Sequence, residues 1–470
     1  MSMRNGQQRI RRGGSFVARK AYNRLNRIFS HMALASSLSP FVPATVNSRI
    51  RYAGLSSIST AKATLEALKP EVGSSLEDLH TPALVVIKEN FERNLKTIHE
   101  KLPEHVSVRP HVKAHKSPVI GRMQLEAGAQ GLCAAKLSEA EVLVAGGCLD
   151  VCITNEVIGK RNLRRLASLA KKDGAVISVC VDSKENIEEM ASIMKEENVK
   201  GLGVLIEVNV GQNRCGVEPG MPAADLAHAI AKHQPWLEFL GLHAYHGSNQ
   251  HVRDPLGREG TVKQQVAPAV QSTLDAIKSQ HDIDCKVVTG GGTGSYPFEV
   301  ESGLYTEIQP GSYIFMDVDY SKNLQRSDRQ PGPGPFLPSL FILTTVVSVS
   351  TQGWAVVDAG MKAVSLDSGA PRIYSLDFEP QDDSVEYICG GDEHGIIKPR
   401  TSSQQQQQEL AYKVGDLLLL QPGHCDPTVN LYDYFSFINE KKGEEKSNRG
   451  SEKKWVVSGN VAVAARGPGL

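Results

Sequence analysis

The chain has 470 residues, with 40% apolar content and equal totals of 52 basic and 52 acidic side chains. At roughly 100 to 200 residues per domain, this length predicts two or more domains with sizeable cores. Zero net charge excludes a global attraction to nucleic acid or anionic membrane, and no run of about 18 apolar residues is present to span a bilayer. We therefore expect a soluble globular protein with no nucleic-acid or membrane partner.

The neutral total conceals a strongly basic N-terminal segment. Residues 1–65 contain eleven basic and no acidic side chains, which leaves 41 basic against 52 acidic, or −11, in the rest. Arginine-rich segments that contain serine and lack acidic residues are typical of organelle transit peptides, and Leu25, Ile28, Phe29 and Met32 recur at helical spacing. A mitochondrial matrix address fits best. A disordered basic arm, plastid targeting and a cytoplasmic location are the alternatives.

The eight cysteines are scattered, without a CxxC pair or a short framework. This usage favours a reducing compartment, with most of the thiols acting as small core hydrophobes.

Short apolar strands alternate with helical segments from residue 106 onwards. The predicted strands lie near 106–112, 131–135, 150–154, 176–181, 203–209, 238–244, 286–289 and 305–309. Amphipathic patterns predict helices such as 137–146, 160–172 and 183–197 between them. Eight alternating units predict a parallel (β/α)8 TIM barrel of the α/β class over residues 81–325, although the count also fits a doubly wound sheet.

The composition changes after Asp319. A proline- and glycine-rich connector at 329–338 precedes β-rich runs at 341–349, 354–358, 413–420 and 455–464. We expect a second, all-β domain over residues 335–470, to which a strand at 81–87 is a candidate addition. The glutamines at 404–408 and the charged stretch 441–454 are expected to be surface loops of low complexity.

Polar and glycine residues follow most of the predicted strands. They are Lys113, Lys136, Asn155, Asp182, Arg214, Tyr245, His246 and the glycine-rich stretch 290–294. In a barrel these positions share the C-terminal rim, where barrel active sites are built.

The segment RPHVKAHKSP (109–118) places Lys113 at the end of the first barrel strand. A lysine desolvated there beside other cationic groups would have a lowered pKa, which suits covalent attachment of a carbonyl cofactor. An ordinary charged residue on the rim is the alternative.

The loop TGGGTGSY (289–296) follows the seventh barrel strand. Its glycines allow successive backbone N–H groups to converge on an anion, and Thr293 and Ser295 add hydroxyl donors. Phosphate binding after strand seven or eight recurs in barrels, whereas a tight turn is the structural alternative. No P-loop motif is present.

Three further residues are candidates on chemical grounds. His424 and Asp426 in PGHCDPT share one face if the segment is extended, and imidazole with carboxylate suits a divalent ion. A capping histidine and an Asp-Pro turn are the alternative. His246 is a candidate general base, and Arg214 is a candidate for holding an oxyanion or for a surface salt bridge.

Taken together, these blocks resemble the D-threonine aldolase and D-serine dehydratase family, whose alanine-racemase-like fold binds pyridoxal phosphate. The resemblance runs from about Thr81 to the C-terminus. It includes TPALVV (81–86), RPHVKAHK (109–116), GLCAAKLSEAE (131–141), VNVGQNRCGV (208–217), TGGGTG (289–294), YTEIQPGSYIFMD (305–317), DAGMKAVSLDSG (358–369) and PGHCDP (422–427).

The resemblance implies roles for individual residues. Lys113 would carry the cofactor, Arg214 would contact its ring oxygen, and Gln309 stands where racemases present an arginine to the ring nitrogen. Tyr245 would belong to the same site, and Gly291, Gly292, Thr293 and Gly294 would hold the phosphate with help from Tyr313. A neutral Gln309 weakens the ring as an electron sink, so additional electrophilic help is expected.

His424 and Asp426 are the expected source of that help. Their His-x-Asp pattern resembles the metal pair of the aldolases, whereas D-serine dehydratases typically show His-x-Cys. Mn²⁺ is the expected ion, with Zn²⁺ or Mg²⁺ as alternatives.

The resemblance thus implies a lyase that cleaves D-3-hydroxy amino acids to glycine and an aldehyde, with His246 as the base. Dehydration of D-serine or 3-hydroxy-D-aspartate to a 2-oxo acid and ammonia is the alternative, and cofactor binding without turnover is a third. A homodimer is implied as well.

Overall fold

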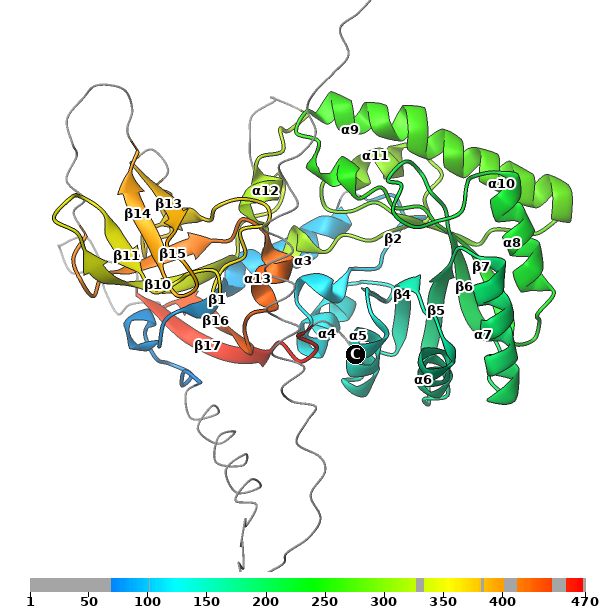
Figure 1. The fold of residues 1–470 in the computed structure, drawn as a ribbon, viewed down its shortest axis with the longest axis horizontal. Coiled ribbons are helices and arrows are strands. Elements are labelled where there is room, and N and C mark those ends of the chain that lie inside the picture. The colour runs from blue at the N-terminus through cyan, green and yellow to red at the C-terminus, as the bar shows by residue number, and fades with distance from the viewer. Residues whose placement is uncertain are drawn as a thin grey trace, which may run out of the picture. The chain divides into compact units, whose positions relative to one another are not determined.

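The computed structural model describes residues 69–100, 102–326, 334–381, 384–400, 412–441 and 454–467. The basic segment 1–65, the glutamines at 404–408 and most of the stretch 441–454 lie outside the described residues. The described residues form an eight-stranded barrel and a nine-stranded sheet domain (Figure 1). No helix in these ranges combines the length and the apolar character that a membrane span requires.

All eight predicted barrel strands are confirmed, and neighbouring strands pair in parallel. They are β2 (Ser107–Val108), β3 (Leu132–Ala134), β4 (Asp150–Glu156), β5 (Val176–Val181), β6 (Leu202–Glu207), β7 (Leu237–His243), β8 (Val287–Gly290) and β9 (Glu307–Ile308). The paired order is β2-β9-β8-β7-β6-β5-β4-β3. A parallel bridge between His111 and Cys133 links the two ends of this path, so the sheet curls into a barrel.

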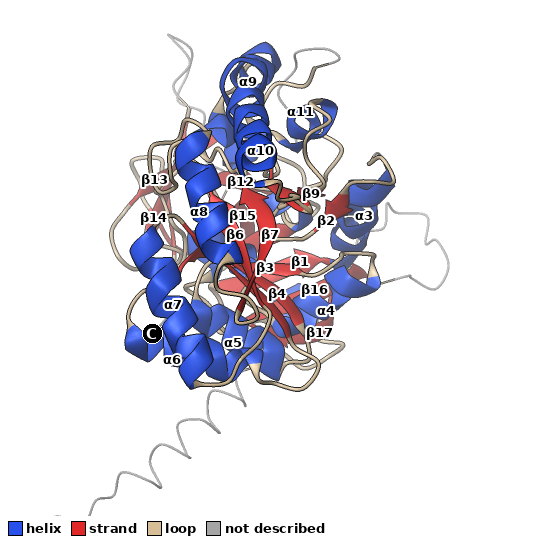
Figure 2. Cartoon of the chain, turned by 90° about the vertical axis from the view of Figure 1, so that its right-hand side faces the viewer, coloured by secondary structure: helices blue, strands red, loops and turns tan. Residues whose placement is uncertain are grey.

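Helices surround the barrel strands, as Figure 2 shows. They are α3 (Lys88–Glu100), α4 (Pro118–Glu126), α5 (Leu137–Ala145), α6 (Lys160–Ala170), α7 (Lys184–Glu196), α8 (Met221–Ala231), α9 (Pro255–Thr261), α10 (Ala267–His281), α11 (Tyr296–Glu301) and α12 (Val318–Ser321). In α7 the buried Ile187, Met190, Ala191 and Met194 recur every three or four residues, which places one apolar face against the strands. Shorter helical turns are η1 (Leu76–Asp78), η2 (Val112–Ala114), η3 (Ser248–His251), η4 (Val262–Val266) and η5 (Ser312–Ile314).

The inside of the barrel is filled by side chains that alternate with those facing the helices. Cys133, Cys152 and Cys180 come from neighbouring strands and form a small buried cluster with Leu205. All eight cysteines lie within the described ranges, and each is a free thiol. Five of them are buried, as expected for small core hydrophobes.

The second domain is built on a mixed sheet. Its strands are β1 (Ala83–Ile87), β10 (Leu340–Val349), β11 (Ala355–Val357), β12 (Arg372–Tyr374), β13 (Val385–Cys389), β14 (Gly395–Pro399), β15 (Leu417–Gln421), β16 (Tyr434–Glu440) and β17 (Trp455–Ala462). The main path is β13-β14-β11-β10-β1-β16-β17, and β15 pairs with β10 and β12. β1 lies between β10 and β16 and is buried along its whole length, although it precedes the barrel in the sequence.

The turn after β15 is fastened to the C-terminal end of the barrel. The N–H groups of Val318 and Asp319 donate to the carbonyls of Pro422 and Gly423, and the N–H of Cys425 donates to Asp317 Oδ2 at 3.0 Å. These bonds bring the segment 422–426, which leads into the short helix α13 (Cys425–Val429), to the rim that carries Lys113.

Candidate active site

A cavity of about 530 Å³ opens at the C-terminal ends of the barrel strands. Its lining comes from segments that follow most of the strands and from the turn 422–426 of the sheet domain. The titratable lining residues are His111, Lys113, Glu207, Arg214, Cys215, His243, Tyr245, His251, Tyr320, His424 and Asp426.

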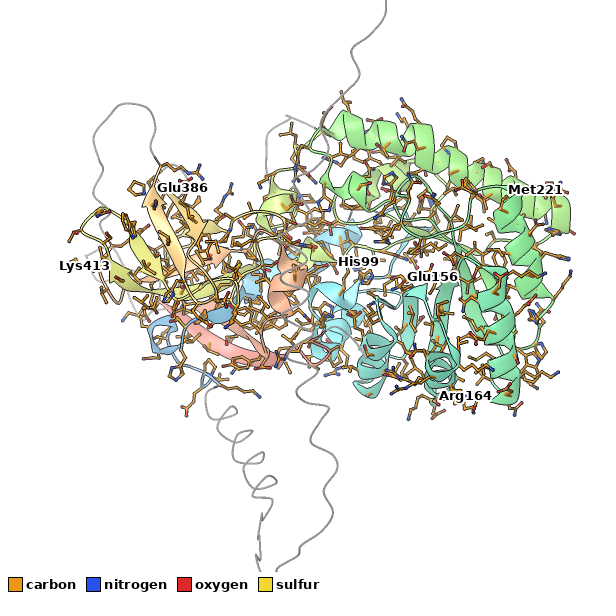
Figure 3. The ribbon with its side chains drawn as sticks, viewed as in Figure 1. His99, Glu156, Arg164, Met221, Glu386 and Lys413 are labelled. Carbon is orange, nitrogen blue, oxygen red and sulfur yellow. The ribbon has the colours of Figure 1, made fainter. Side chains whose placement is uncertain are left out.

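A hollow of similar volume, about 520 Å³, lies on the outer surface between α5 and α6. It is lined by helix residues such as Arg161, Arg164 and Lys172, and Figure 3 shows Arg164 at the periphery while Glu156 lies near the centre of the barrel. The outer hollow has basic groups but no glycine-rich loop and no carboxylate beside a histidine. We therefore assign the chemistry to the cavity at the barrel rim.

Lys113 lies in η2, directly after β2, and its Nζ is 3.7 Å from Asp426 Oδ2. The side chain stays 42% exposed to the open cavity. Burial would lower the pKa of Lys113, but Tyr245 and Asp426 outweigh both burial and the nearby Arg214, so the pKa is raised. The expectation of a lowered pKa was therefore wrong, because a carboxylate from the sheet domain reaches the lysine.

The glycine-rich loop is shaped as an anion cradle. Gly291 adopts φ +68°, and a Cβ on Gly292 would lie 2.5 Å from Gln250 Oε1, so neither position readily accepts a larger residue. Thr293 Oγ1 is buried without a hydrogen-bond partner. Among the described residues, the N–H groups of Gly292 and Thr293 also find no acceptor. Convergent donors of this kind fit a phosphate.

The floor of the cavity is polar and hydrogen-bonded. His243 Nε2 lies 3.1 Å from Gln309 Oε1, and Gln309 Nε2 donates to Thr289 Oγ1 at 2.8 Å. Glu207 lies beside His243, and Arg214 reaches Glu207 Oε1 at 4.0 Å while its side chain remains 55% exposed. Gln309, Arg214 and Tyr245 all line the cavity.

His424 and Asp426 both line the cavity, but the backbone differs from the prediction. The segment is not extended: His424 caps α13, and Asp426 lies in its first turn. His424 Nδ1 is 2.7 Å from Asp367 Oδ2, which leaves Nε2 available to a metal. A carboxylate that orients a metal-binding histidine is the usual outer partner of such a site, so the donor set fits a divalent ion. Its remaining positions fall to water or substrate.

Four predicted residues do not line the cavity: His246, Tyr313, Gly291 and Gly294. His246 turns aside, and its Nδ1 lies 3.3 Å from the N–H of Asn249 and 3.2 Å from Ser248 Oγ. Tyr313 is buried, where its hydroxyl lies 3.3 Å from Gln124 Nε2 and its ring meets Phe336 edge-on. The geometry gives no support to a base role for His246 or to phosphate binding by Tyr313. Within the glycine loop, Gly292 and Thr293 line the cavity, and Gly291 and Gly294 shape the turn behind them.

Four further residues of the site, Asp367, Glu207, His243 and His251, were not predicted from the sequence. Glu207 and His243 end otherwise apolar strands, GVLIE and EFLGLH, and a charged residue at such a position is a usable signal of a site. Asp367 has no local signal, because it meets His424 only through the fold.

Comparison with known proteins agrees with this architecture. The family described as "Alanine racemase, N-terminal domain" matches residues 86–319, and "Putative serine dehydratase domain" matches residues 339–438. The chain is 40% identical over 370 residues to a D-threonine aldolase from Arthrobacter sp, covering 78% of this chain and 92% of that protein. The chain belongs to the D-threonine aldolase family. This membership confirms the resemblance stated above.

Further relatives support the D-threonine aldolase family. The 3-hydroxy-D-aspartate aldolase of Paracoccus denitrificans is 37% identical over 79% of this chain and 92% of its own. The crystal structure of D-threonine aldolase from Filomicrobium marinum superposes with a TM-score of 0.73 at 37% identity, over 84% of this chain and 98% of that chain. The family implies pyridoxal phosphate and, for the aldolases, a divalent metal, and the cradle, Lys113 and the His424–Asp426 pair fit both groups.

Proposed function

We propose that the chain is a lyase that uses pyridoxal phosphate and a divalent metal to cleave D-3-hydroxy amino acids, such as D-threonine, to glycine and an aldehyde. One observation carries the proposal: Lys113, in the turn η2 that follows β2, and the His424–Asp426 pair of the sheet domain face each other across one cavity, with Lys113 Nζ 3.7 Å from Asp426 Oδ2. The residue that would attach the cofactor is thus adjacent to the residues that would bind the metal.

The cofactor supplies an electron sink for the charge left on the α-carbon when the Cα–Cβ bond breaks. Lys113 Nζ would hold it covalently, and Thr293 Oγ1 with the N–H groups of Gly292 and Thr293 would bind its phosphate. Gln309, held by His243 and Thr289, would face the ring. Arg214 is long and exposed enough to reach an oxygen on the ring or a substrate carboxylate.

The metal supplies a Lewis acid that makes the substrate hydroxyl easier to deprotonate. His424 Nε2 and Asp426 would hold it, and Asp367 keeps the imidazole oriented through Nδ1. We propose Mn²⁺, because one imidazole and one carboxylate leave several positions for oxygen ligands. Cys425, which a His-x-Cys enzyme would need one position later, is fully buried and donates from Sγ toward Asp426 Oδ1 at 3.3 Å. This arrangement favours the aldolase over the dehydratase.

His251 is the residue that we propose for taking the hydroxyl proton. The other lining histidines have Nε2 committed elsewhere: His111 Nε2 contacts Thr154, His243 Nε2 contacts Gln309, and His424 Nε2 is assigned to the metal. His251 Nδ1 lies 2.5 Å from Asp319 Oδ2, while no partner is found among the described residues for Nε2. A carboxylate on Nδ1 leaves the lone pair on Nε2, as in other His–Asp dyads.

Incubation of the purified protein with D-threonine, D-serine and 3-hydroxy-D-aspartate, with and without a chelator, tests the proposal. We expect glycine and an aldehyde, and we expect chelation to abolish the reaction and Mn²⁺ to restore it most fully. A 2-oxo acid and ammonia would instead establish the dehydratase, and absence of turnover would contradict both.

Replacement of His251 by Asn tests the proton acceptor. We expect kcat to fall by about a hundredfold, with unchanged visible absorbance of the bound cofactor, while His394→Asn on the sheet domain serves as the matched control. An unchanged kcat would reject the role.

Two expectations from the sequence remain proposals. We propose that residues 1–65 direct the protein to the mitochondrial matrix and that the enzyme acts as a homodimer. Fluorescent fusions with and without these residues test the first, and sedimentation analysis of the purified enzyme tests the second.

A further inference from the structure

A second group of metal-ligating side chains lies at the floor of the cavity. Cys180 lies near the end of β5, Glu207 ends β6 and His243 ends β7, so that three consecutive strands each contribute one residue. Their ligand atoms all lie within 4.8 Å of one another. The exposed fractions are 0% for Cys180, 6% for Glu207 and 2% for His243, and the cationic side chain of Arg214, which reaches Glu207, is 4.0 Å away and 55% exposed. A buried carboxylate is costly unless it is closely paired, so Glu207 has room for a further cation.

His243 aims an unpaired nitrogen into this group. The bond from Gln309 Nε2 to Thr289 Oγ1 turns the amide oxygen of Gln309 toward His243, so His243 Nε2 donates to Oε1. In the neutral ring the lone pair is then on Nδ1, which is buried without a hydrogen-bond partner. Nδ1 lies 3.4 Å from Glu207 Oε2. Two electron-rich atoms at this separation require a proton or a cation between them.

We propose that Cys180, Glu207 and His243 form a second metal site, suited to Zn²⁺, with its open position toward the cavity. Three protein ligands of the N, S and O types with one open position are typical of zinc. Bonds of about 2.0–2.3 Å place tetrahedral ligands roughly 3.3–3.8 Å apart, a spacing that the 3.4 Å contact already has. The thiolate selects against Mn²⁺, which prefers oxygen ligands, so the two sites differ in metal preference.

Charge and protons balance when Zn²⁺ binds to these three residues. The Cys180 Sγ–H bond breaks as the S–Zn bond forms, and the proton passes to water in the cavity. If the imidazole of His243 is protonated, Nδ1 releases its proton as well. One thiolate and one carboxylate then neutralise the dication. Glu207 and His243 line the same cavity as Lys113, so we expect bound cofactor to block entry of the ion; this expectation of blocked entry, unlike the ligand geometry, rests on the proposed function.

Glu207 also belongs to a competing group with Glu156 and Cys215. Cys215 is partly exposed and that group contains no imidazole, so we favour the set that contains His243. Cys425 beside Asp426 is the third thiol near a metal-binding carboxylate. The experiment has to separate all three thiols.

Titration of the full-length protein with Co²⁺ and Zn²⁺, with and without pyridoxal phosphate, tests the proposal. Without cofactor we expect about two Zn²⁺ per chain and a thiolate-to-cobalt charge-transfer absorption. Cys180→Ser should remove the absorption and one zinc, whereas Cys148→Ser, at another buried cysteine, should retain both. His243→Asn should also lose the second ion, which covers the case in which Cys180→Ser does not fold.

Absence of the charge-transfer absorption in the wild-type protein would overturn the proposal, because it would mean that His243 and Glu207 share a proton instead. Loss of the absorption in Cys215→Ser or Cys425→Ser, with its retention in Cys180→Ser, would also overturn it. Equal charge-transfer absorption with and without bound pyridoxal phosphate would overturn the expectation that the cofactor blocks entry of the ion. Failure to cleave D-threonine would contradict the proposed function while leaving the absorption in place, so the two outcomes are distinguishable.

Discussion

Buried polar groups are paired at one end of the barrel interior and left unpaired at the other. Toward the N-terminal ends of the strands, Arg109 is paired with Glu307 at 2.8 Å and with Asp150 at 2.6 Å. Burial alone would lower the pKa of Arg109, but these carboxylates outweigh it and raise the pKa. At the C-terminal ends, Thr293 Oγ1 and His243 Nδ1 are buried without hydrogen-bond partners.

The paired groups at the N-terminal end stabilise the fold, whereas the unpaired groups at the C-terminal end are available for function. Buried polar groups cost free energy unless they are paired, so a fold under no other constraint satisfies them within the protein, as around Arg109. Groups left unpaired at the opposite end are those that a ligand can satisfy. Substitutions at either end of the barrel interior test this contrast.

The largest effect is expected at Lys113. Lys113→Ala removes the only nucleophilic amine that lines the cavity, and we expect activity to fall by more than about a thousandfold with loss of the visible absorbance of bound cofactor. Because the side chain is 42% exposed, the melting temperature should change little. Absorbance that persists in this variant would refute the cofactor assignment.

Arg109→Met should affect stability instead. It leaves Glu307, whose side chain is 6% exposed, without its cation, and removal of one partner of a buried pair costs about 3–5 kcal/mol. Lys286→Met breaks the exposed pair with Glu238 and is the matched control, with an expected cost below about 1 kcal/mol. Denaturant unfolding measures both. Similar losses in the two variants would mean that the N-terminal end does not rely on its paired charges.

Thr293→Val tests an unpaired hydroxyl. A hydrogen bond to a charged group contributes about 1.5–3 kcal/mol, so we expect the Kd for pyridoxal phosphate to rise by roughly tenfold or more. Binding of pyridoxal, which lacks the phosphate, should be unaffected. Thr261→Val, at a hydroxyl that donates to the Gly257 carbonyl, is the control. Equal weakening for both ligands would place the phosphate elsewhere.

Glu299 packs behind Gly291 and is expected to make the stability of the protein depend on pH. Burial raises the pKa of Glu299 to about 7, although Ser295 donates to it. The folded protein therefore keeps a proton that the unfolded chain releases near pH 4.5, so the free energy of unfolding falls as pH rises from about 4.5 to about 7.

Glu299→Gln should remove that slope. Relative to the wild type, we expect the variant to gain about 2–3 kcal/mol of stability between pH 5 and pH 8, by thermal unfolding at both values. A wild-type slope that survives the substitution would assign the titration to another group.

The fold was predictable where the signals were local. A continuous apolar run predicts β5 (VISVCV), and helical spacing of apolar residues predicts α7; together with seven further alternating units they predict a barrel. The place of β1 between β10 and β16 was open, because strand pairing across the whole chain leaves no local pattern.

The sequence predicted which residues form the candidate site better than it predicted their conformations and contacts. His424 and Asp426 were predicted to be extended, but Pro427 is compatible with the first turn of a helix and Asp317 accepts from the N–H of Cys425, which favours α13. β7 ends at His243, and three residues later the side chain of His246 contacts Ser248 and Asn249, so the geometry does not support its predicted role as a base. The raised pKa of Lys113 depends on Tyr245 and on Asp426, which lies more than 300 positions away in the sequence.

The position of β1 has a consequence for how the chain is made. Val86 pairs with Leu340, about 250 residues later, so at roughly 5–20 residues per second a ribosome exposes this apolar strand for some 15–50 s before its first neighbour emerges. The barrel is synthesised entirely within that interval. A newly made chain therefore presents an unpaired strand to chaperones or to other nascent chains, and a fragment that ends after the barrel would retain it permanently.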